Sequence, residues 1–258
     1  MSDGELVHLE IARGVATVTL DSPHNRNALS RRLLADLDRH VRAAEADQRT
    51  RVIVLTGAGP VFCSGADLKE APEARAASEP SGPGGLVAIV NALWASPKPV
   101  IARINGPARA GGLGLMCACD IVVAVDTATF AFSEVRVGVA PAIISVVTLP
   151  RLGPTRALEL FLTADTFDAR AAVGYGMINA AVSHDDLDAA IRRYADLLLQ
   201  GAPAALAETK RLVRDVPRLP TAEAFHRMAA LSARLFASEE AREGMAAFAQ
   251  KRPPRWRS

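Results

Sequence analysis

Three short, largely apolar segments constrain the fold of this chain more strongly than any other feature. They span residues 52–55, 100–104 and 121–125. Runs of this length and composition are typical of strands that are buried on both faces, as in parallel sheets. Segments with helical periodicity lie between them, and strands that alternate with helices favour an α/β fold.

The N-terminal region adds a β-hairpin and a helix to this expectation. Polar and apolar residues alternate over residues 6–11 and 15–20, on either side of Arg13-Gly14, which predicts two antiparallel strands and a tight turn. Ser30 is a suitable N-cap for a helix that runs to about residue 46.

After about residue 186 the pattern changes to amphipathic helices. We therefore predict two units, residues 1–186 and residues 187–258, with the second unit entirely helical. Helices with exposed apolar faces need a partner surface, either the first unit or another subunit. The predicted helices of the second unit span residues 187–200, 203–215, 221–237 and 239–248.

Composition excludes several classes of protein. Half of the 258 residues are hydrophobic and the net charge is +2, which argues against disorder and against a nucleic-acid partner. Cys63, Cys117 and Cys119 are too few for a disulfide framework, so we expect buried thiols. No metal-ligand spacing, signal peptide or membrane-length apolar run is found, which predicts a metal-free cytoplasmic protein without a membrane partner.

Two glycine-rich turns carry candidate binding groups. They span residues 62–68 and 105–112, each follows an apolar strand, and the second opens a helix. Backbone N–H groups at such turns lack partners, and a helix N-terminus carries partial positive charge, so two adjacent turns could hold one oxyanion. Ordinary turn chemistry is the alternative. The spacing of a nucleotide phosphate loop is absent.

With these turns and other short motifs, the chain resembles the crotonase, or enoyl-CoA hydratase/isomerase, superfamily over nearly its whole length. The resemblance implies a spiral of ββα units over residues 1–186 and a helical trimerisation region over residues 187–258. It also implies an acyl-CoA thioester substrate, no separate cofactor, and a homotrimer or a hexamer. The motifs occur in the family's order and include Arg26-Asn27-Ala28-Leu29, Gly65-Ala66-Asp67-Leu68, Asn105-Gly106, Gly111-Gly112, Cys119-Asp120 and Phe132-Ser133-Glu134.

The resemblance also assigns catalytic groups. It implies that the backbone N–H groups of Ala66 and Gly111 form an oxyanion hole and that Glu134 is the acid/base. Similar hydratases carry a further glutamate three residues after the oxyanion glycine, and this chain has Gly114 there. Without the resemblance, an ion pair with Arg136 would be the simpler interpretation of Glu134.

One glutamate is compatible with three functions. Apolar neighbours of Glu134 predict a raised pKa, which suits proton exchange near neutral pH. Residues 133–145 look most like hydratases of the 3-methylglutaconyl-CoA type, so we rank hydration of a short or branched enoyl-CoA first. Δ3,Δ2-enoyl-CoA isomerisation comes second, and non-catalytic binding of CoA thioesters, as in a scaffold protein, comes third.

Further residues are expected to bind the substrate. We hypothesise that Arg109 meets a carboxylate or polar group on the acyl chain, with a solvent-facing turn residue as the alternative. Residues 70–90 are expected to shape the acyl pocket. For Lys69 and Lys251 the alternative is a solvated surface charge. The remaining candidates for substrate and CoA binding are Arg26, Ala28, Ser64, Asp67, Leu68, Lys69, Gly112, Gly114, Phe248 and Lys251.

Overall fold

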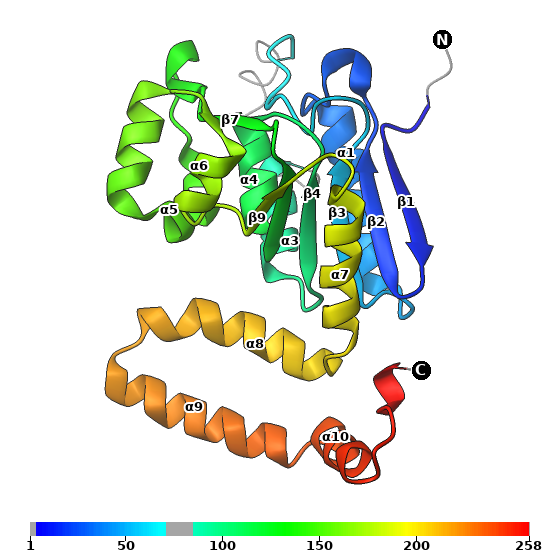
Figure 1. Ribbon diagram of the computed structural model, residues 1–258. Helices are drawn as coiled ribbons and strands as arrows, with labels where there is room; N and C mark the ends of the chain where they lie inside the picture. The colour runs from blue at the N-terminus through cyan, green and yellow to red at the C-terminus, as the bar shows by residue number, and fades with distance from the viewer. Residues whose placement is uncertain (1–3, 71–84, 258) are drawn as a thin grey trace.

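The computed structural model describes residues 4–70 and 85–257, and its centre is a mostly parallel sheet (Figure 1). The strand order of this sheet is β1-β2-β3-β4-β6-β9, and β1 and β2 form the predicted antiparallel hairpin. A smaller sheet of order β5-β7-β8 stands beside it. The larger sheet comprises β1 (Val7–Ala12), β2 (Val15–Leu20), β3 (Val52–Gly57), β4 (Val100–Ile104), β6 (Ile121–Val125) and β9 (Ala180–Val182); the smaller comprises β5 (Ala108–Arg109), β7 (Thr129–Ala131) and β8 (Phe167–Asp168).

Helices cover both faces of the larger sheet, which explains its apolar strands. The helices α1 (Arg31–Ala46), α3 (Leu86–Ala95) and α4 (Gly111–Ala118) lie behind the sheet in Figure 1, and α7 (Leu187–Leu199) crosses its front. All six residues of β3 are therefore buried, as the sequence predicts.

The first long helix begins as its sequence predicts. The Ser30 side chain accepts a hydrogen bond from the Leu33 N–H at 3.2 Å, which makes Ser30 the N-cap of α1. Leu33, Leu37 and Val41 recur at helical spacing and are buried against the sheet.

The helix α5 (Ala142–Thr163) differs from expectation. The spacing of apolar residues predicts a helix only over residues 155–162, whereas the structure extends this helix by more than three turns toward the N-terminus. The run of apolar residues before Pro150 hides the helical period, and the chain kinks at Gly153, whose φ is +66°. The short helix α6 (Ala169–Gly174) follows α5, and single 3₁₀ turns span η1 (Pro23–Asn25) and η2 (Glu134–Val137).

The C-terminal helices divide differently from the predicted units. Leu187, Ile191 and Ala195 of α7 belong to the buried core, so the core continues past the boundary predicted at residue 186. The remaining helices project away from the sheet as an arm (Figure 1). The arm consists of α8 (Pro203–Asp215), η3 (Val216–Arg218), α9 (Thr221–Phe236), α10 (Glu239–Ala249) and η4 (Arg255–Arg257).

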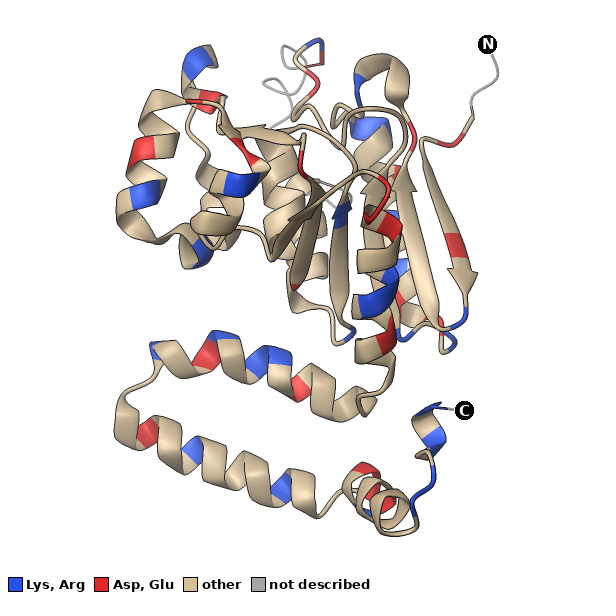
Figure 2. Ribbon diagram, viewed as in Figure 1, with Lys and Arg blue, Asp and Glu red and all other residues tan. Residues whose placement is uncertain are grey.

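A charged seam fastens α8 to the core. The Asp120 carboxylate, just before β6, accepts from Lys210 Nζ at 2.7 Å and from Arg214 Nη2 at 2.8 Å. It also accepts from the Val100 N–H at 2.8 Å, and the Arg214 guanidinium lies 4.0 Å above the Trp94 ring. Lys and Arg side chains are frequent along α8 (Figure 2), and these two connect the arm to the sheet.

Two predictions about the chain as a whole can be compared with this fold. Cys63, Cys117 and Cys119 are all buried free thiols, which confirms the prediction. Within residues 4–70 and 85–257, no helix is long and apolar enough to cross a membrane.

Candidate active site

A small cavity lies where the two glycine-rich turns meet the start of α5. Its volume is about 280 Å³, and Ala66, Gly111 and Glu134 all contribute to its wall. Larger hollows lie elsewhere on the described surface, including one of about 720 Å³ beside Arg13 and Trp256, but they contain none of these groups. The complete wall consists of Leu29, Leu34, Ala66, Leu86, Ala110, Gly111, Glu134, Ala140, Pro141, Ala142, Ile143 and Ile144.

The first turn is held in place by a buried asparagine. Asn27 is fully buried, and its side-chain NH₂ donates to the carbonyl oxygens of Ala58 at 3.0 Å and Val61 at 2.9 Å. Its side-chain oxygen accepts from the Ser22 N–H at 2.8 Å. These bonds tie the N-terminal segment to the loop that leads into the first turn, and they satisfy the polar groups of the buried Asn27 side chain.

The backbone pairing of the first turn leaves one donor unused. The Leu29 N–H donates to the Gly65 carbonyl at 2.8 Å, and the Asp67 N–H donates to the Leu29 carbonyl at 3.5 Å. This register skips the Ala66 N–H, which donates to no acceptor in the described part of the chain. Ala66 is exposed and lines the cavity, so a ligand there can accept from it.

The second turn brings another unused donor to the same place. Ala110 has a φ of +47°, a strained conformation for a residue with a Cβ, and its N–H donates to the Ala131 carbonyl at 3.1 Å. Gly111 then begins α4, and its N–H also donates to no acceptor within residues 4–70 and 85–257. The turns touch each other, since a Cβ at Gly65 would lie 3.0 Å from the Ala110 Cβ.

Glu134 lines this cavity, and one of its two carboxyl oxygens has no hydrogen-bond partner among the described residues. Its Oε2 atom is buried and forms no hydrogen bond in the described part of the chain. Burial raises the pKa of Glu134 above its ordinary value, as its apolar neighbours predict. The alternative ion pair is wrong, because Arg136 donates to the Ala164 carbonyl at 3.1 Å instead.

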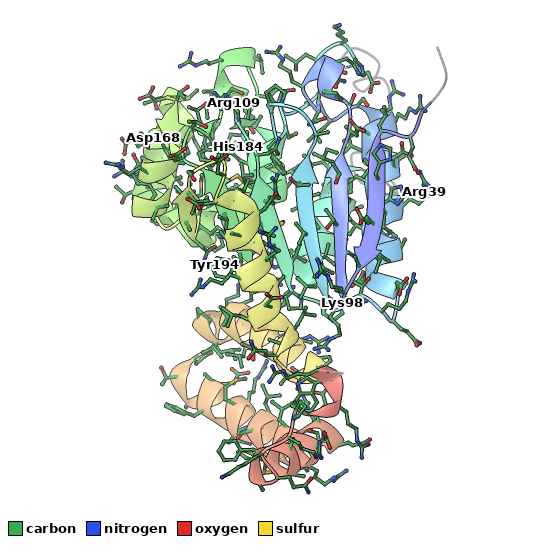
Figure 3. All side chains as sticks on the ribbon, turned by 45° about the vertical axis from the view of Figure 1, so that its right-hand side comes forward. Arg39, Lys98, Arg109, Asp168, His184 and Tyr194 are labelled. Atoms are coloured by element: carbon green, nitrogen blue, oxygen red, sulfur yellow. The ribbon has the colours of Figure 1, made fainter. Side chains whose placement is uncertain are left out.

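Arg109 is directed away from the cavity. Its guanidinium donates to the Ala108 carbonyl at 2.9 Å and to Thr129 Oγ1 at 2.8 Å, which ties β5 to β7. Arg109 is absent from the cavity wall and lies at the end of the sheet opposite Lys98 (Figure 3). The structure therefore does not bring Arg109 to the position where it would meet a polar acyl group.

Residues 10–258 match the family model described as enoyl-CoA hydratase/isomerase. The chain belongs to this family. It is 35% identical over 259 residues to a carnitinyl-CoA dehydratase of Shigella flexneri, covering 98% of each chain. An enoyl-CoA hydratase of Shewanella pealeana superimposes with a TM-score of 0.90 at 31% identity, over 97% of this chain and 96% of that one.

A structure of an enoyl-CoA hydratase/isomerase of Marinobacter aquaeolei gives a TM-score of 0.89 at 32% identity, over 99% of this chain and 100% of that one. These matches confirm the crotonase fold that the sequence motifs predict. The chain is accordingly an enzyme of the enoyl-CoA hydratase/isomerase family, whose members act on acyl-CoA thioesters.

The family context makes the contact between Gly114 and Ile144 informative. Gly114 lies in α4, where similar hydratases have a second glutamate, and a Cβ built there would lie 2.3 Å from Ile144 Cγ2. Ile144 of α5 thus fills the space that a side chain at position 114 would enter. Gly112 is similarly confined, because a Cβ built on it would lie 2.9 Å from the Cys63 Cβ. Neither Gly112 nor Gly114 lines the cavity.

Most residues predicted to bind CoA lie around the first turn. The Arg26 carbonyl accepts from the Ser64 N–H at 3.1 Å, and an Asp67 side-chain oxygen accepts from the Lys69 N–H at 3.1 Å. Leu68 is 61% exposed on the same turn. The structure therefore clusters Arg26, Ala28, Ser64, Asp67, Leu68 and Lys69, with Ala28 buried and the two cationic side chains exposed.

The two predicted residues in the arm are not part of this cluster. Phe248 is 88% exposed, and Lys251 follows it just after α10, at the end of the molecule opposite the cavity (Figure 1). Within one subunit they do not meet the cavity wall.

Sequence reasoning missed much of the cavity wall. Leu29 and the apolar run at the start of α5 have clear sequence signals, but Leu34 and Leu86 resemble ordinary core residues. The expectation that residues 70–90 shape the pocket applies to Leu86, which lines it. Residues 71–84 lie outside the described residues.

Proposed function

We propose that this enzyme adds water reversibly to the 2,3-double bond of an enoyl-CoA thioester, with Glu134 as the only carboxylate acid/base. One observation supports this most strongly. The carboxyl group of Glu134, whose Oε2 has no hydrogen-bond partner in the described part of the chain, shares a cavity of about 280 Å³ with the unused N–H groups of Ala66 and Gly111. A proton-transfer group and two oxyanion donors in one small apolar cavity suit reactions that pass through an enolate.

The two backbone donors would activate the thioester. In this proposal its carbonyl oxygen accepts hydrogen bonds from the Ala66 and Gly111 N–H groups, the second at the positive end of α4. Negative charge then develops on that oxygen as C3 is attacked. One such donor is worth about 2.7–4 kcal/mol of barrier in other enzymes, and backbone donors need no reorganisation.

Glu134 would supply the proton transfers. Its carboxylate takes a proton from water as the water oxygen bonds to C3, and the acid that results gives a proton to C2 of the enolate. One O–H bond of water and the π bond between C2 and C3 break, a C3–O and a C2–H bond form, and the carboxylate is regenerated. Its raised pKa supports both halves of this cycle, because proton exchange is most efficient when the pKa lies nearer the working pH.

The contact between Gly114 and Ile144 favours a second candidate, double-bond isomerisation. A single carboxylate on an otherwise apolar wall can move a proton between C4 and C2 without water. The same oxyanion donors would stabilise the dienolate that forms when the C4–H bond breaks.

A carnitinyl group does not suit the cavity of this chain. A carnitinyl group carries a quaternary ammonium ion, which proteins commonly bind against aromatic faces. The described wall around Glu134 contains no aromatic side chain, and Trp94, the aromatic residue of the adjoining hollow, already has the Arg214 guanidinium 4.0 Å from its ring.

The test is to incubate the purified protein with a 2-enoyl-CoA and, separately, with a 3-enoyl-CoA. Hydration removes the ultraviolet absorbance of the conjugated thioester and adds the mass of one water, whereas isomerisation creates that absorbance. Glu134→Gln should lower the rate by about 10²–10⁴-fold, the usual share of a general acid/base. Glu159→Gln is the matched control, because Glu159 is exposed and paired with Arg156.

Full activity in Glu134→Gln would refute the role assigned to Glu134. A wild-type protein that is inactive on both substrates yet binds them would instead support the third alternative, non-catalytic binding of CoA thioesters.

We also infer that the arm assembles the chain into a homotrimer, or into a hexamer made from two such trimers. Phe225, Phe236 and Phe248 are 75%, 69% and 88% exposed on α9 and α10, which is costly for an isolated subunit. In a trimer the arm could bring Phe248 and Lys251 to the CoA of a neighbouring subunit. Light scattering of the purified protein gives the number of subunits, and a monomer would contradict this proposal.

A further inference from the structure

A second apolar hollow lies directly beside the catalytic cavity. Its volume is about 320 Å³, and it is formed between α3 and α5. Ile143 lines both hollows. On α3, Leu86 lines the cavity and the next residue, Val87, lines the second hollow. We name this second hollow the α3–α5 groove, lined by Val87, Ala88, Val90, Asn91, Trp94, Ile143, Val146 and Val147.

The groove is built from one face of each helix. Val87, Val90 and Trp94 recur along α3 at spacings of three and four residues, so they lie on one side of it. Ile143, Val146 and Val147 do the same on α5. Leu86 lines the cavity and Trp94 lines the groove, and the axis of α3 rises by about 12 Å between them, so the groove extends along α3 away from the cavity.

Several apolar side chains of the groove are exposed to solvent. Val146 is 66% exposed, Ile143 is 38% exposed and Val87 is 37% exposed. Neither the groove nor the adjoining cavity has a cationic side chain among its described lining residues, and Glu134 is the one anionic group there. A contiguous apolar surface next to a catalytic cavity fits a hydrocarbon ligand, because removing both surfaces from water is favourable.

We infer that the α3–α5 groove binds the distal part of the substrate's acyl chain, which leaves the catalytic cavity past Ile143. The preferred acyl group is thus an uncharged hydrocarbon chain longer than the cavity alone can hold. This inference rests on the proposed acyl-CoA chemistry at Glu134 and adds the chemical class of the acyl group.

The same walls disfavour an acyl group that ends in a carboxylate. Such a group would lose hydration against apolar side chains without a cation to compensate, which is unfavourable. Arg109, the nearest sequence candidate for that cation, is bonded to Thr129 instead.

The first experiment compares kcat/KM for crotonyl-CoA and 2-decenoyl-CoA. 2-Decenoyl-CoA has six more chain carbons than crotonyl-CoA, and burial of only two of them would make the wild type prefer 2-decenoyl-CoA by about tenfold or more. Val146→Glu places a charge in the groove at an exposed helical position and should lower the ratio by a similar factor, because a charge there disfavours the longer hydrocarbon chain. Leu158→Glu is the matched control, because Leu158 is 61% exposed on the same helix but does not line the groove.

The results separate this inference from the proposed function. Equal kcat/KM values for the two substrates in the wild type, or equal effects of Val146→Glu and Leu158→Glu on the ratio, would overturn the groove assignment while leaving the reaction at Glu134 intact. If neither substrate reacts, the proposed function fails, and calorimetry with butyryl-CoA and decanoyl-CoA still tests the groove. Tighter binding of decanoyl-CoA, weakened in Val146→Glu alone, supports the groove, and equal binding overturns it.

Discussion

The cavity at Glu134 and the seam between α8 and the sheet each contain one carboxylate withdrawn from solvent, and the two carboxylates have opposite surroundings. Asp120 at the seam accepts from Lys210, Arg214 and the Val100 N–H. Glu134 in the cavity has a buried oxygen with no partner in the described part of the chain. A compensated carboxylate holds two segments together, whereas an uncompensated one is free to exchange a proton with a ligand.

The backbone groups of the two regions also differ, since some around the cavity lack partners and the Lys98 carbonyl at the seam has one. Around the cavity, Ala110 adopts a φ of +47° and the Ala66 and Gly111 N–H groups are unused. At the seam, the Lys210 ammonium group donates to the Lys98 carbonyl at 2.7 Å in addition to its ion pair. Strain and unused donors thus gather where a substrate would supply the missing partners.

The largest expected effect on stability comes from breaking the seam. Asp120→Ala leaves Lys210 and Arg214 without their carboxylate, with 9% and 15% of their side chains exposed, and should lower the free energy of unfolding by about 3–5 kcal/mol. Urea denaturation measures it. Asp188→Ala is the control. The Asp188 side chain is 61% exposed and pairs with Arg103, so the loss of this ion pair should lower the free energy of unfolding by less than about 1 kcal/mol. Equal losses would remove the distinction drawn for Asp120.

A smaller effect is expected from crowding the wall of the cavity. Gly114→Ala forces a Cβ toward Ile144, which is 2% exposed, and should cost about 1–3 kcal/mol of unfolding free energy. Gly174→Ala is the matched control, since a Cβ at this helical glycine meets no atom within 4 Å. A double-mutant cycle with Ile144→Ala should show that the two changes together cost less than their sum. Strict additivity would mean that the contact does not limit position 114.

Replacing Glu134 by Gln should raise the stability at neutral pH, by less than the losses expected for Asp120→Ala and Gly114→Ala. Because burial raises the pKa of Glu134 above 4.5, the folded protein binds more protons than the unfolded chain between 4.5 and the raised value. Stability therefore falls as the pH rises through that window. Glu134→Gln does not titrate, so its Tm should exceed that of the wild type at neutral pH, and the difference should shrink below pH 4.5. A lower Tm at neutral pH would show that the carboxylate is compensated after all.

The smallest effect is expected at Arg109. Because its guanidinium is bonded within the fold, Arg109→Leu should change kcat/KM equally for a dicarboxylic and a hydrocarbon enoyl-CoA, leaving their ratio unchanged. A selective loss on the dicarboxylic substrate would restore the hypothesis that Arg109 meets a carboxylate.

Local signals explain what was predictable from the sequence. Apolar strands, the Ser30 cap and the alternation of the hairpin each depend on neighbours within a few residues, and the structure confirms all of them. The raised pKa of Glu134 was predictable for the same reason, since its apolar neighbours adjoin it in sequence.

Contacts between distant segments were not predictable. Nothing near Arg109 indicates that Thr129, twenty residues later, accepts from its guanidinium. The N-terminal half of α5 was missed because a uniformly apolar run shows no amphipathic period. The contact of α5 with Gly114 depends on how helices pack against each other, and so does the α3–α5 groove. No local sequence pattern encodes this packing.

The contact between Gly114 and Ile144 has a consequence for how such an enzyme can diverge. A carboxylate could enter at position 114 only after residue 144 had become smaller, because the reverse order passes through an overpacked protein. The order of the two substitutions is therefore constrained by packing, a requirement of the fold that selection on catalysis alone would not reveal.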